Sequence, residues 1–209
     1  NFPRKNEKVG QVPDSARFWR LFLAGQSNMA GRGYVEPQDT LPDARILMLT
    51  PEKEWVVAKE PLQTYQPALT GLGPGLAFAK KIAETAAEDI TIGLIPCAVG
   101  GSSVEQWLND SLFHQVRLRS NFSSLLETAR PAGTFKAIIW HQGEADATSA
   151  GLPLYKERLS SLFLFFRKET GHEKLPVIMG ELGLFPGNKK YNSGYRQLNR
   201  KLAEIVAGD

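Results

Sequence analysis

Five short apolar runs alternate along this chain with segments of helical periodicity. We predict β-strands where the apolar runs stand, at residues 18–23, 44–49, 90–95, 137–140 and 177–179. Several of these runs are apolar at nearly every position, which is typical of strands that are buried on both faces of a sheet. The periodic segments predict helices at residues 74–87, 110–129, 154–169 and 191–206, the second of them with Asp110 as its N-cap.

This alternation of strands and helices predicts an α/β fold. Successive strand–helix–strand units join through right-handed crossovers, which makes the strands parallel and places helices on both faces of the sheet. We therefore expect a three-layer α/β/α sandwich around a five-stranded parallel sheet. Ligands of such sheets bind at the carboxyl ends of the strands, so residues that directly follow a strand are candidates for chemistry.

Length and composition are those of one folded domain. The chain has 209 residues, of which 42% are hydrophobic and 22% charged, and these values exclude a disordered or fibrous protein. We expect residues 1–16 to form an irregular N-terminal arm and residues 17–209 to form the domain. The net charge of +3 comes from scattered basic residues, which argues against a nucleic-acid partner. No apolar run reaches the ~18 residues of a membrane span, and the single cysteine, Cys97, excludes an internal disulfide bond.

Polar and glycine-rich segments follow three of the predicted strands. They are residues 24–33, 96–103 and 141–146. Because the carboxyl ends of parallel strands share one edge of the sheet, we expect these three segments to meet. The first segment places Ser27 in a glycine-flanked turn, where this residue is either an exposed nucleophile or the N-cap of a short helix.

The other two segments carry groups that suit either ester chemistry or a structural role. Gly100 and Gly101 either let a backbone N–H approach a substrate oxygen or simply form a tight turn. The side-chain amide of Gln142 can donate to a developing oxyanion, although a buried glutamine beside a strand end is usually structural. Glu144 and Asp146 offer carboxylates for acid–base work, for salt bridges or for helix capping.

Four segments together resemble one known family. They read Gly25-Gln-Ser-Asn-Met-Ala-Gly-Arg-Gly33, Gly71-Leu-Gly-Pro-Gly-Leu-Ala-Phe78, Pro96-Cys-Ala-Val-Gly-Gly101 and Trp140-His-Gln-Gly-Glu-Ala-Asp146. These motifs are similar to those of the SGNH-hydrolase superfamily, and within it to the branch of sialate O-acetylesterases and carbohydrate esterase family 6 (acetylxylan esterases). The resemblance implies a flavodoxin-like fold and a serine esterase that removes acetyl groups from carbohydrate esters through an acyl-enzyme. It implies an acetylated carbohydrate or small ester as the partner, no membrane association, and neither a metal nor an organic cofactor.

The resemblance also assigns roles to residues at the three strand ends. Ser27 would be the nucleophile and would donate its backbone N–H to the oxyanion hole. Gly101 would supply a second backbone N–H, and Gln142 would take the place of the family's asparagine as a side-chain donor. The remaining motif positions would bind substrate or shape the site, and these are Gln26, Asn28, Gly100, His141 and Glu144.

One part of the family pattern is not found in this sequence. The family's acid and base come from an Asp-x-x-His near the C-terminus, and the 209 residues contain no such motif. We expect that this segment follows residue 209 in the complete protein. Of the three histidines, His172 precedes a predicted strand and His114 sits in a predicted helix, so His141 is the in-chain substitute at the correct edge.

The missing base leaves a second function open. A protein with this fold and no base would bind acylated sugars without cleaving them. Trp107 and Trp140, near the predicted edge, would then stack on sugar rings, unless they belong to the core. The chain begins with Asn1 rather than Met, and together with the sugar-ester resemblance this suggests secretion or export to the periplasm.

Overall fold

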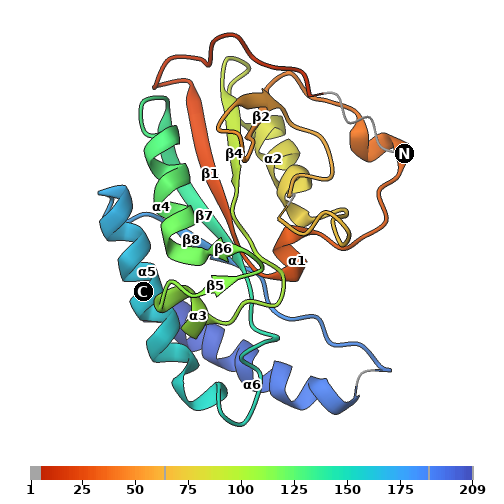
Figure 1. Cartoon of the computed structure of the whole chain (residues 1–209), viewed down its shortest axis with the longest axis vertical. Coiled ribbons are helices and arrows are strands. Elements are labelled where there is room, and N and C mark those ends of the chain that lie inside the picture. The colour runs from red at the N-terminus through yellow and green to blue at the C-terminus, as the bar shows by residue number, and fades with distance from the viewer. Residues whose placement is uncertain (1–5, 64, 188, 209) are drawn as a thin grey trace.

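A computed structural model of the chain describes residues 6–63, 65–187 and 189–208. A six-stranded sheet lies at its centre (Figure 1). The strands are β1 (Phe18–Gly25), β2 (Ile46–Leu49), β3 (Trp55–Val57), β4 (Thr91–Pro96), β7 (Thr134–His141) and β8 (Val177–Met179). Their order across the sheet is β3-β2-β4-β1-β7-β8, and all except β3 run parallel. Strand β1 is therefore central, with its carboxyl end between those of β4 and β7.

The five predicted strands are confirmed, and the sheet has one strand more than predicted. The additional strand β3 pairs antiparallel with β2 at the edge of the sheet. Lys8 forms an isolated bridge with Val56 of β3, and the Val9 N–H donates to Trp55 O at 3.1 Å. Residues 6–16 are otherwise irregular. The predicted arm therefore partly covers an edge strand whose N–H and C=O groups would otherwise be unpaired.

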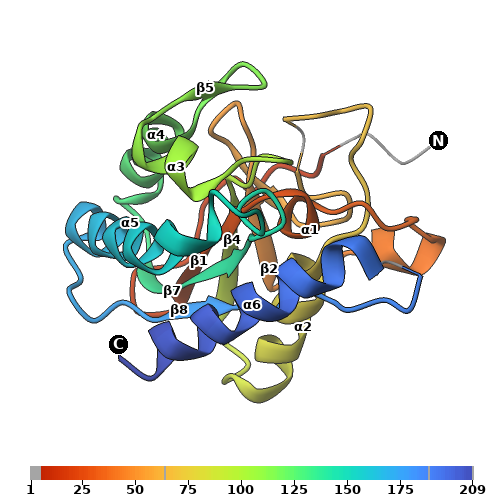
Figure 2. The ribbon, with the colours of Figure 1, turned by 90° about the horizontal axis from the view of Figure 1, so that it is seen from below.

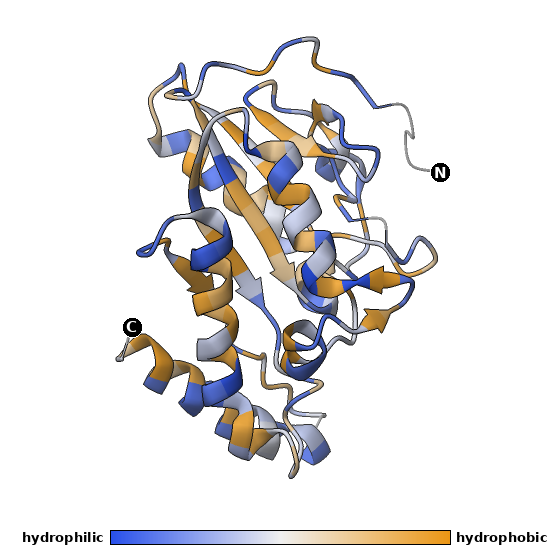
Figure 3. Ribbon diagram, turned by 60° about the vertical axis from the view of Figure 1, so that its left-hand side comes forward, coloured by the Kyte–Doolittle hydropathy of each residue, from blue (hydrophilic) through white to orange (hydrophobic). Residues whose placement is uncertain are grey.

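Helices cover both faces of the sheet. Helix α2 (Pro74–Thr85) lies on one face, and α4 (Leu118–Ala129) and α5 (Tyr155–Thr170) lie on the other (Figure 1). Successive side chains of β1 point to opposite faces, so Leu21 packs in the core on the α2 side and Phe22 packs in the core with α4 and α5. Figure 3 shows the apolar strands enclosed between these layers. The predicted three-layer α/β/α sandwich is thus confirmed.

The segment predicted as one helix at residues 110–129 is wrong in its first part. A hairpin of β5 (Leu112–Phe113) and β6 (Val116–Arg117) precedes α4, which begins only at Leu118. His114 and Gln115 form its turn with φ of 47° and 63°, the positive values that a type I′ turn requires. His114 therefore lies in a hairpin turn and not on a helix.

The prediction that Asp110 is the N-cap of the helix that directly follows it is wrong. Its side chain instead caps α4, which begins farther along the chain. Its carboxylate accepts hydrogen bonds from the Ser120 N–H at 2.8 Å and from Ser120 Oγ at 2.5 Å. Ser120 belongs to the first turn of α4, where backbone N–H groups have no acceptor within the helix. The hairpin brings the carboxylate back to these donors.

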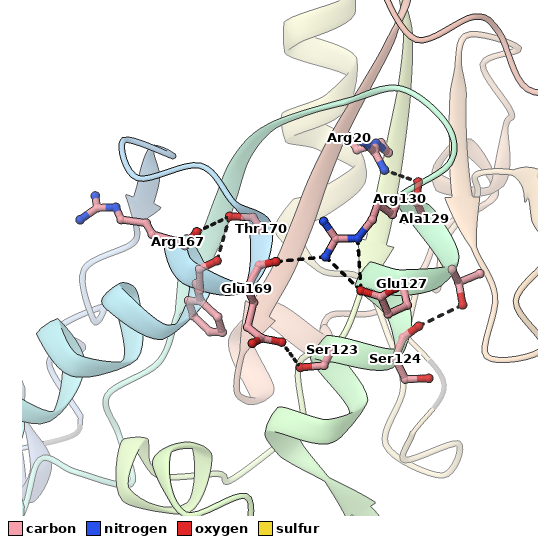
Figure 4. Close-up of polar contacts among 11 residues, drawn as sticks. Arg20, Ser123, Ser124, Glu127, Ala129, Arg130, Arg167, Glu169 and Thr170 are labelled. Atoms are coloured by element: carbon pink, nitrogen blue, oxygen red, sulfur yellow. Dashed lines mark hydrogen bonds and ion pairs between the residues drawn. The ribbon is translucent and has the colours of Figure 1, made fainter.

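Polar contacts join the ends of α4 and α5 (Figure 4). The Arg130 guanidinium donates to Glu169 O at 3.1 Å, and Ser123 Oγ donates to Glu169 Oε2 at 2.7 Å. Arg20 of β1 is buried nearby and donates to Gly133 O at 2.6 Å. The Arg20 contact ties the amino end of β1 to the residue before β7, opposite the end where the candidate site lies.

Shorter elements complete the fold. They are α1 (Ser27–Ala30), η1 (Pro37–Thr40), α3 (Val104–Leu108) and η2 (Leu152–Leu154), and the last long helix is α6 (Lys189–Val206). Helix α6 buries Leu198, Leu202 and Ile205 against the core on the α5 side. In the described part of the chain, no helix combines the length and the apolar character that crossing a bilayer requires.

Candidate active site

The segments that follow β1, β4 and β7 are hydrogen-bonded to one another, as predicted for three strand ends at one edge. The Gln26 N–H donates to His141 O at 3.0 Å, and the Val99 N–H donates to Gly25 O at 3.1 Å. Gly25 has φ of 130°, and a Cβ at this position would lie 2.2 Å from His141 O. Only glycine therefore lets β1 and β7 approach so closely just before Ser27. Figure 2 views the molecule from the end that carries α1.

Ser27 is the first residue of α1 and is half-buried. The N-cap position belongs to Gln26, so the interpretation of Ser27 as an N-cap is wrong. Gln26 is buried; its Nε2 lies 3.5 Å from Ser27 Oγ, and its Oε1 accepts from the Ala145 N–H at 3.3 Å. Within residues 6–63, 65–187 and 189–208, the Ser27 hydroxyl donates no hydrogen bond. Its backbone N–H lies in the first turn of α1, where N–H groups have no acceptor within the helix.

The Gly100–Gly101 turn follows β4 and presents one satisfied and one free N–H group. The Gly100 N–H donates to Gln66 Oε1 at 3.1 Å, and Gly100 is buried. Gly101 is exposed and has φ of 81°, and its N–H donates no hydrogen bond to any described residue. The turn can therefore offer the Gly101 N–H to an acceptor from solvent.

Gln142 is fully buried, and its amide is occupied by protein groups. Its Nε2 donates to Ser102 O at 3.1 Å and to Asp146 Oδ2 at 2.5 Å, while its Oε1 faces the Tyr155 hydroxyl at 3.3 Å. An amide NH₂ has two hydrogens, and both are used here. This geometry corrects the prediction that Gln142 donates directly to an oxyanion. The amide instead holds the segment after β7 against the segment after β4.

Asp146 completes this link between the two segments. It is buried, and its Oδ2 accepts from the Val104 N–H at 3.0 Å, at the start of α3, as well as from Gln142. Burial raises the pKa of Asp146, although the hydrogen bonds from Val104 and Gln142 oppose this effect. The sequence allows acid–base work, salt bridges or helix capping for this carboxylate, and these contacts fit helix capping.

Asp146→Asn is expected to raise the free energy of unfolding at neutral pH by up to about 1 kcal/mol, measured by urea denaturation. Asparagine keeps a carbonyl oxygen for both donors and costs less to bury, and the raised pKa of Asp146 indicates that the burial cost of the charge outweighs its hydrogen bonds. Asp89→Asn, at an exposed carboxylate, is the matched control and should change stability by less than about 0.5 kcal/mol. A variant less stable than the unsubstituted protein would show that the hydrogen bonds to the charged carboxylate outweigh the cost of its burial.

The remaining predicted site residues lie on α1, at the end of β7 and directly after β7. Asn28 Nδ2 donates to Glu144 Oε1, so the helix that carries Ser27 is tied to the segment after β7. Glu144 Oε2 is buried and has no hydrogen-bond partner among the described residues. The His141 ring packs on Gly180, where a Cβ would lie 2.2 Å from His141 Cδ2, and its buried Nδ1 likewise has no described partner. No hydrogen bond joins His141 to Ser27 within the described residues.

The other histidines and the tryptophans do not join the site. His172 precedes β8, at the opposite end of that strand, as predicted. Trp107 and Trp140 are buried core residues that pack edge-to-face with ring centroids 5.6 Å apart, so they are not available for stacking on sugars. In the described part of the chain, no group of three or more His, Cys, Asp or Glu residues is arranged to hold a metal ion.

Sequence reasoning missed several residues that shape the site. Ser102 is buried; its Oγ lies 2.8 Å from Val99 O and accepts from the Trp107 indole N–H at 2.9 Å. Gln66 contacts Gly100 from the loop between β3 and α2. Ser102 stands in a segment that the sequence analysis did select, whereas the loop around Gln66 has no apolar period or motif that could have found it.

Comparisons with known proteins identify the family of the chain. The family model described as carbohydrate esterase, sialic acid-specific acetylesterase, matches residues 19–207. A probable carbohydrate esterase of Arabidopsis thaliana is 31% identical over 226 residues, covering 98% of this chain and 83% of that protein. The X-ray structure of this Arabidopsis protein matches with a TM-score of 0.78 at 26% identity, covering 90% of this chain and 81% of that one.

Two further solved structures share the fold. NanS matches with a TM-score of 0.71 at 18% identity, over 93% of this chain and 76% of that one. A carbohydrate acetylesterase from Xanthomonas citri matches with a TM-score of 0.63 at 22% identity, over 91% of this chain and 47% of that one. The family match confirms the resemblance drawn from the four motifs. The chain belongs to the carbohydrate esterases of the sialic acid-specific acetylesterase family.

Proposed function

We propose that this protein is a serine esterase that removes acetyl groups from carbohydrate esters through an acyl-enzyme. The observation that carries the proposal is the position of Ser27 beside two hydrogen-bonded glycine-rich segments. Ser27 is half-buried at the central strand end, and the exposed Gly101 belongs to the neighbouring segment, which is hydrogen-bonded to Gly25. This is the arrangement that acyl transfer needs, with a nucleophile next to donors for the oxyanion.

The reaction runs in two steps. Ser27 Oγ attacks the acetyl carbonyl carbon, and a base removes the hydroxyl proton as the new C–O bond forms. The tetrahedral oxyanion accepts from the N–H groups of Ser27 and Gly101. The bond to the sugar oxygen then breaks, that oxygen takes the proton, and the acetyl group remains on Ser27. Water attacks the acyl-enzyme in the same way and releases acetate.

Other residues of the site act through these groups. Gln142 and Asp146 hold the segments after β4 and β7 together, and we propose that they position the Gly101 N–H and do not touch the substrate. Asn28 and Glu144 fix α1 to the segment after β7. Gln26 places its Nε2 at 3.5 Å from Ser27 Oγ, where it can orient the hydroxyl.

The base is the part of the reaction that the contacts within the chain do not supply. No hydrogen bond joins a histidine to Ser27 within the described residues, and the sequence has no Asp-x-x-His. The expectation that such a segment follows residue 209 stays a prediction. A chain without the base should hydrolyse esters slowly, because general-base catalysis contributes about 10²- to 10⁴-fold.

Added imidazole tests the proposal on the 209-residue chain itself. We expect imidazole to raise acetate release from an O-acetylated methyl glycoside by about 10-fold or more, because it can accept the Ser27 proton. Acetate is measured with a coupled enzyme assay, and the rate in imidazole without protein is subtracted. Failure of imidazole to stimulate hydrolysis, for a protein that has no activity of its own, would contradict the esterase proposal.

The same experiment distinguishes the second candidate function. The Ser27 hydroxyl without a hydrogen-bonded base favours a protein that binds acetylated sugars without cleaving them. Such a protein would bind the acetylated glycoside more tightly than the deacetylated one in an NMR titration and would release no acetate with imidazole. Trp107 and Trp140 do not contribute to that binding, because both lie in the core.

A further inference from the structure

Gln66 connects the two segments that carry the proposed nucleophile and the proposed oxyanion donor. Its Oε1 accepts from the Gly100 N–H at 3.1 Å and from Arg32 Nη2 at 2.6 Å. A carbonyl oxygen has two lone pairs, so a single atom satisfies both donors. Gln66 itself stands in a loop without helix or strand, between β3 and α2.

Arg32 fastens this contact to the segment after α1. Its Nη1 donates to Gly31 O at 2.7 Å, and the Gly31 N–H in turn donates to Ser27 O at 2.9 Å. Burial lowers the pKa of Arg32, but the guanidinium keeps its charge at neutral pH because arginine is not deprotonated in proteins. A continuous set of contacts therefore runs from Ser27 through Arg32 and Gln66 to Gly100.

Both side chains pack directly on Gly100. A Cβ at this position would lie 2.1 Å from Arg32 Nη2 and 2.3 Å from Gln66 Oε1. The turn therefore has no room to move toward these groups, and the hydrogen bond to Gln66 prevents it from moving away. Glycine has more backbone freedom than any other residue, so two successive glycines need such a restraint to hold one conformation.

We propose that Gln66, held by Arg32, is a positioning residue that fixes the Gly100–Gly101 turn so that the Gly101 N–H stays directed at the oxyanion. This inference rests on the proposed esterase function. Oxyanion donors are effective when they are already oriented before the reaction, and Gln66 satisfies Gly100 while it leaves the next N–H free.

Two substitutions of Gln66 test the role of its hydrogen-bond acceptor separately from the role of its side-chain size. Gln66→Met has a similar length but no acceptor for the Gly100 N–H, whereas Gln66→Glu keeps the acceptor. The first readout is hydrogen exchange of the Gly100 amide by NMR, which needs no activity. We expect exchange to be at least about 10-fold faster in Gln66→Met, as for loss of a hydrogen bond worth about 1.4 kcal/mol, and within about 3-fold of wild type in Gln66→Glu.

The second readout is imidazole-dependent acetate release. Gln66→Met should lower kcat by about 10- to 100-fold with KM changed less than about 3-fold, because the turn acts on the oxyanion and not on the bound ester. Gln66→Glu should keep most of the wild-type kcat. Gln197→Met, at an exposed glutamine of α6, is the control for the substitution itself and should leave kcat unchanged.

Different results would overturn different parts of the inference. If the Gly100 amide exchanged as slowly in Gln66→Met as in the wild type, Gln66 would not hold the turn. Faster exchange with unchanged kcat would show that the turn does not serve the reaction. A wild-type protein that releases no acetate with imidazole would refute the esterase proposal and the catalytic part of this inference together, while hydrogen exchange would still decide whether Gln66 restrains the turn.

Discussion

Ser27→Ala is expected to abolish imidazole-dependent acetate release and to prevent covalent labelling by a fluorophosphonate probe. The hydroxyl is the only protein group in the proposed reaction that forms a bond to the acetyl carbon, so no acyl-enzyme can form without it. In a form of the protein that has its base, loss of a triad member costs about 10⁴- to 10⁶-fold in kcat. The measurements are acetate release from an O-acetylated methyl glycoside and the mass of the labelled peptide.

Without imidazole, the same substitution should change the rate of the 209-residue chain very little. Residues of a catalytic triad act as one unit, so removing the nucleophile adds little once the base is missing. Ser27→Ala and imidazole should therefore be strongly non-additive. This pattern separates attack by Ser27 from general catalysis by imidazole in solution, which Ser27→Ala would leave intact.

Ser193→Ala is the matched control, because Ser193 is exposed on α6. It should keep both the imidazole-dependent rate and the labelling. Imidazole-dependent hydrolysis that survives in Ser27→Ala would mean that another residue or bound imidazole attacks the ester. Labelling of a residue other than Ser27 would reject the assignment of the nucleophile directly.

The sheet could be predicted from sequence because its strands are continuous apolar runs. An apolar run such as residues 90–95 removes its side chains from water only where both faces of the strand are covered. The run therefore predicts a buried strand with parallel neighbours. The edge strand β3 has only three residues and pairs antiparallel with β2, so it lies outside the strand–helix–strand pattern on which the prediction depends. The hairpin at residues 112–117 was missed because its turn residues, His114 and Gln115, lack the Asn-Gly or Asp-Gly signal of a type I′ turn.

The candidate site could be predicted in its position but not in its side-chain directions. Three segments had to meet because parallel strands end at one edge, and hydrogen bonds such as Gln26 N–H to His141 O confirm that they do. Whether the Gln142 amide points to solvent or to the interior depends on its partners, Ser102 and Asp146. Those partners become visible only when the loops are folded, since no periodicity relates them.

The same limit applies to the buried carboxyl group of Glu60, which the sequence does not mark as unusual. Glu60 is only 3% exposed, and its Oε2 accepts from the Leu62 N–H at 3.0 Å. Burial raises its pKa to about 7, against the opposing effect of the backbone N–H groups of Leu62 and Gly73. Desolvation therefore outweighs the hydrogen bonds, and the folded protein prefers the protonated acid.

This preference makes stability depend on pH in a defined direction. Between about pH 4.5, where the unfolded chain releases the proton, and about pH 7, where the folded protein does, the folded state binds more protons. Stability should therefore fall as the pH rises through this window and should then level off. The full shift corresponds to about 3 kcal/mol of unfolding free energy above pH 7.

Glu60→Gln should remove this dependence, because the neutral amide resembles the protonated acid at every pH. We expect the variant to match the wild type near pH 4.5 and to exceed it by about 3 kcal/mol at pH 8, measured by urea denaturation at both values. Glu52→Gln, at an exposed carboxylate, is the control and should leave the difference between the two pH values unchanged. If Glu60→Gln were less stable than the wild type at pH 8, the carboxylate would be a favourable acceptor at the start of α2, and the hydrogen bonds would outweigh its burial.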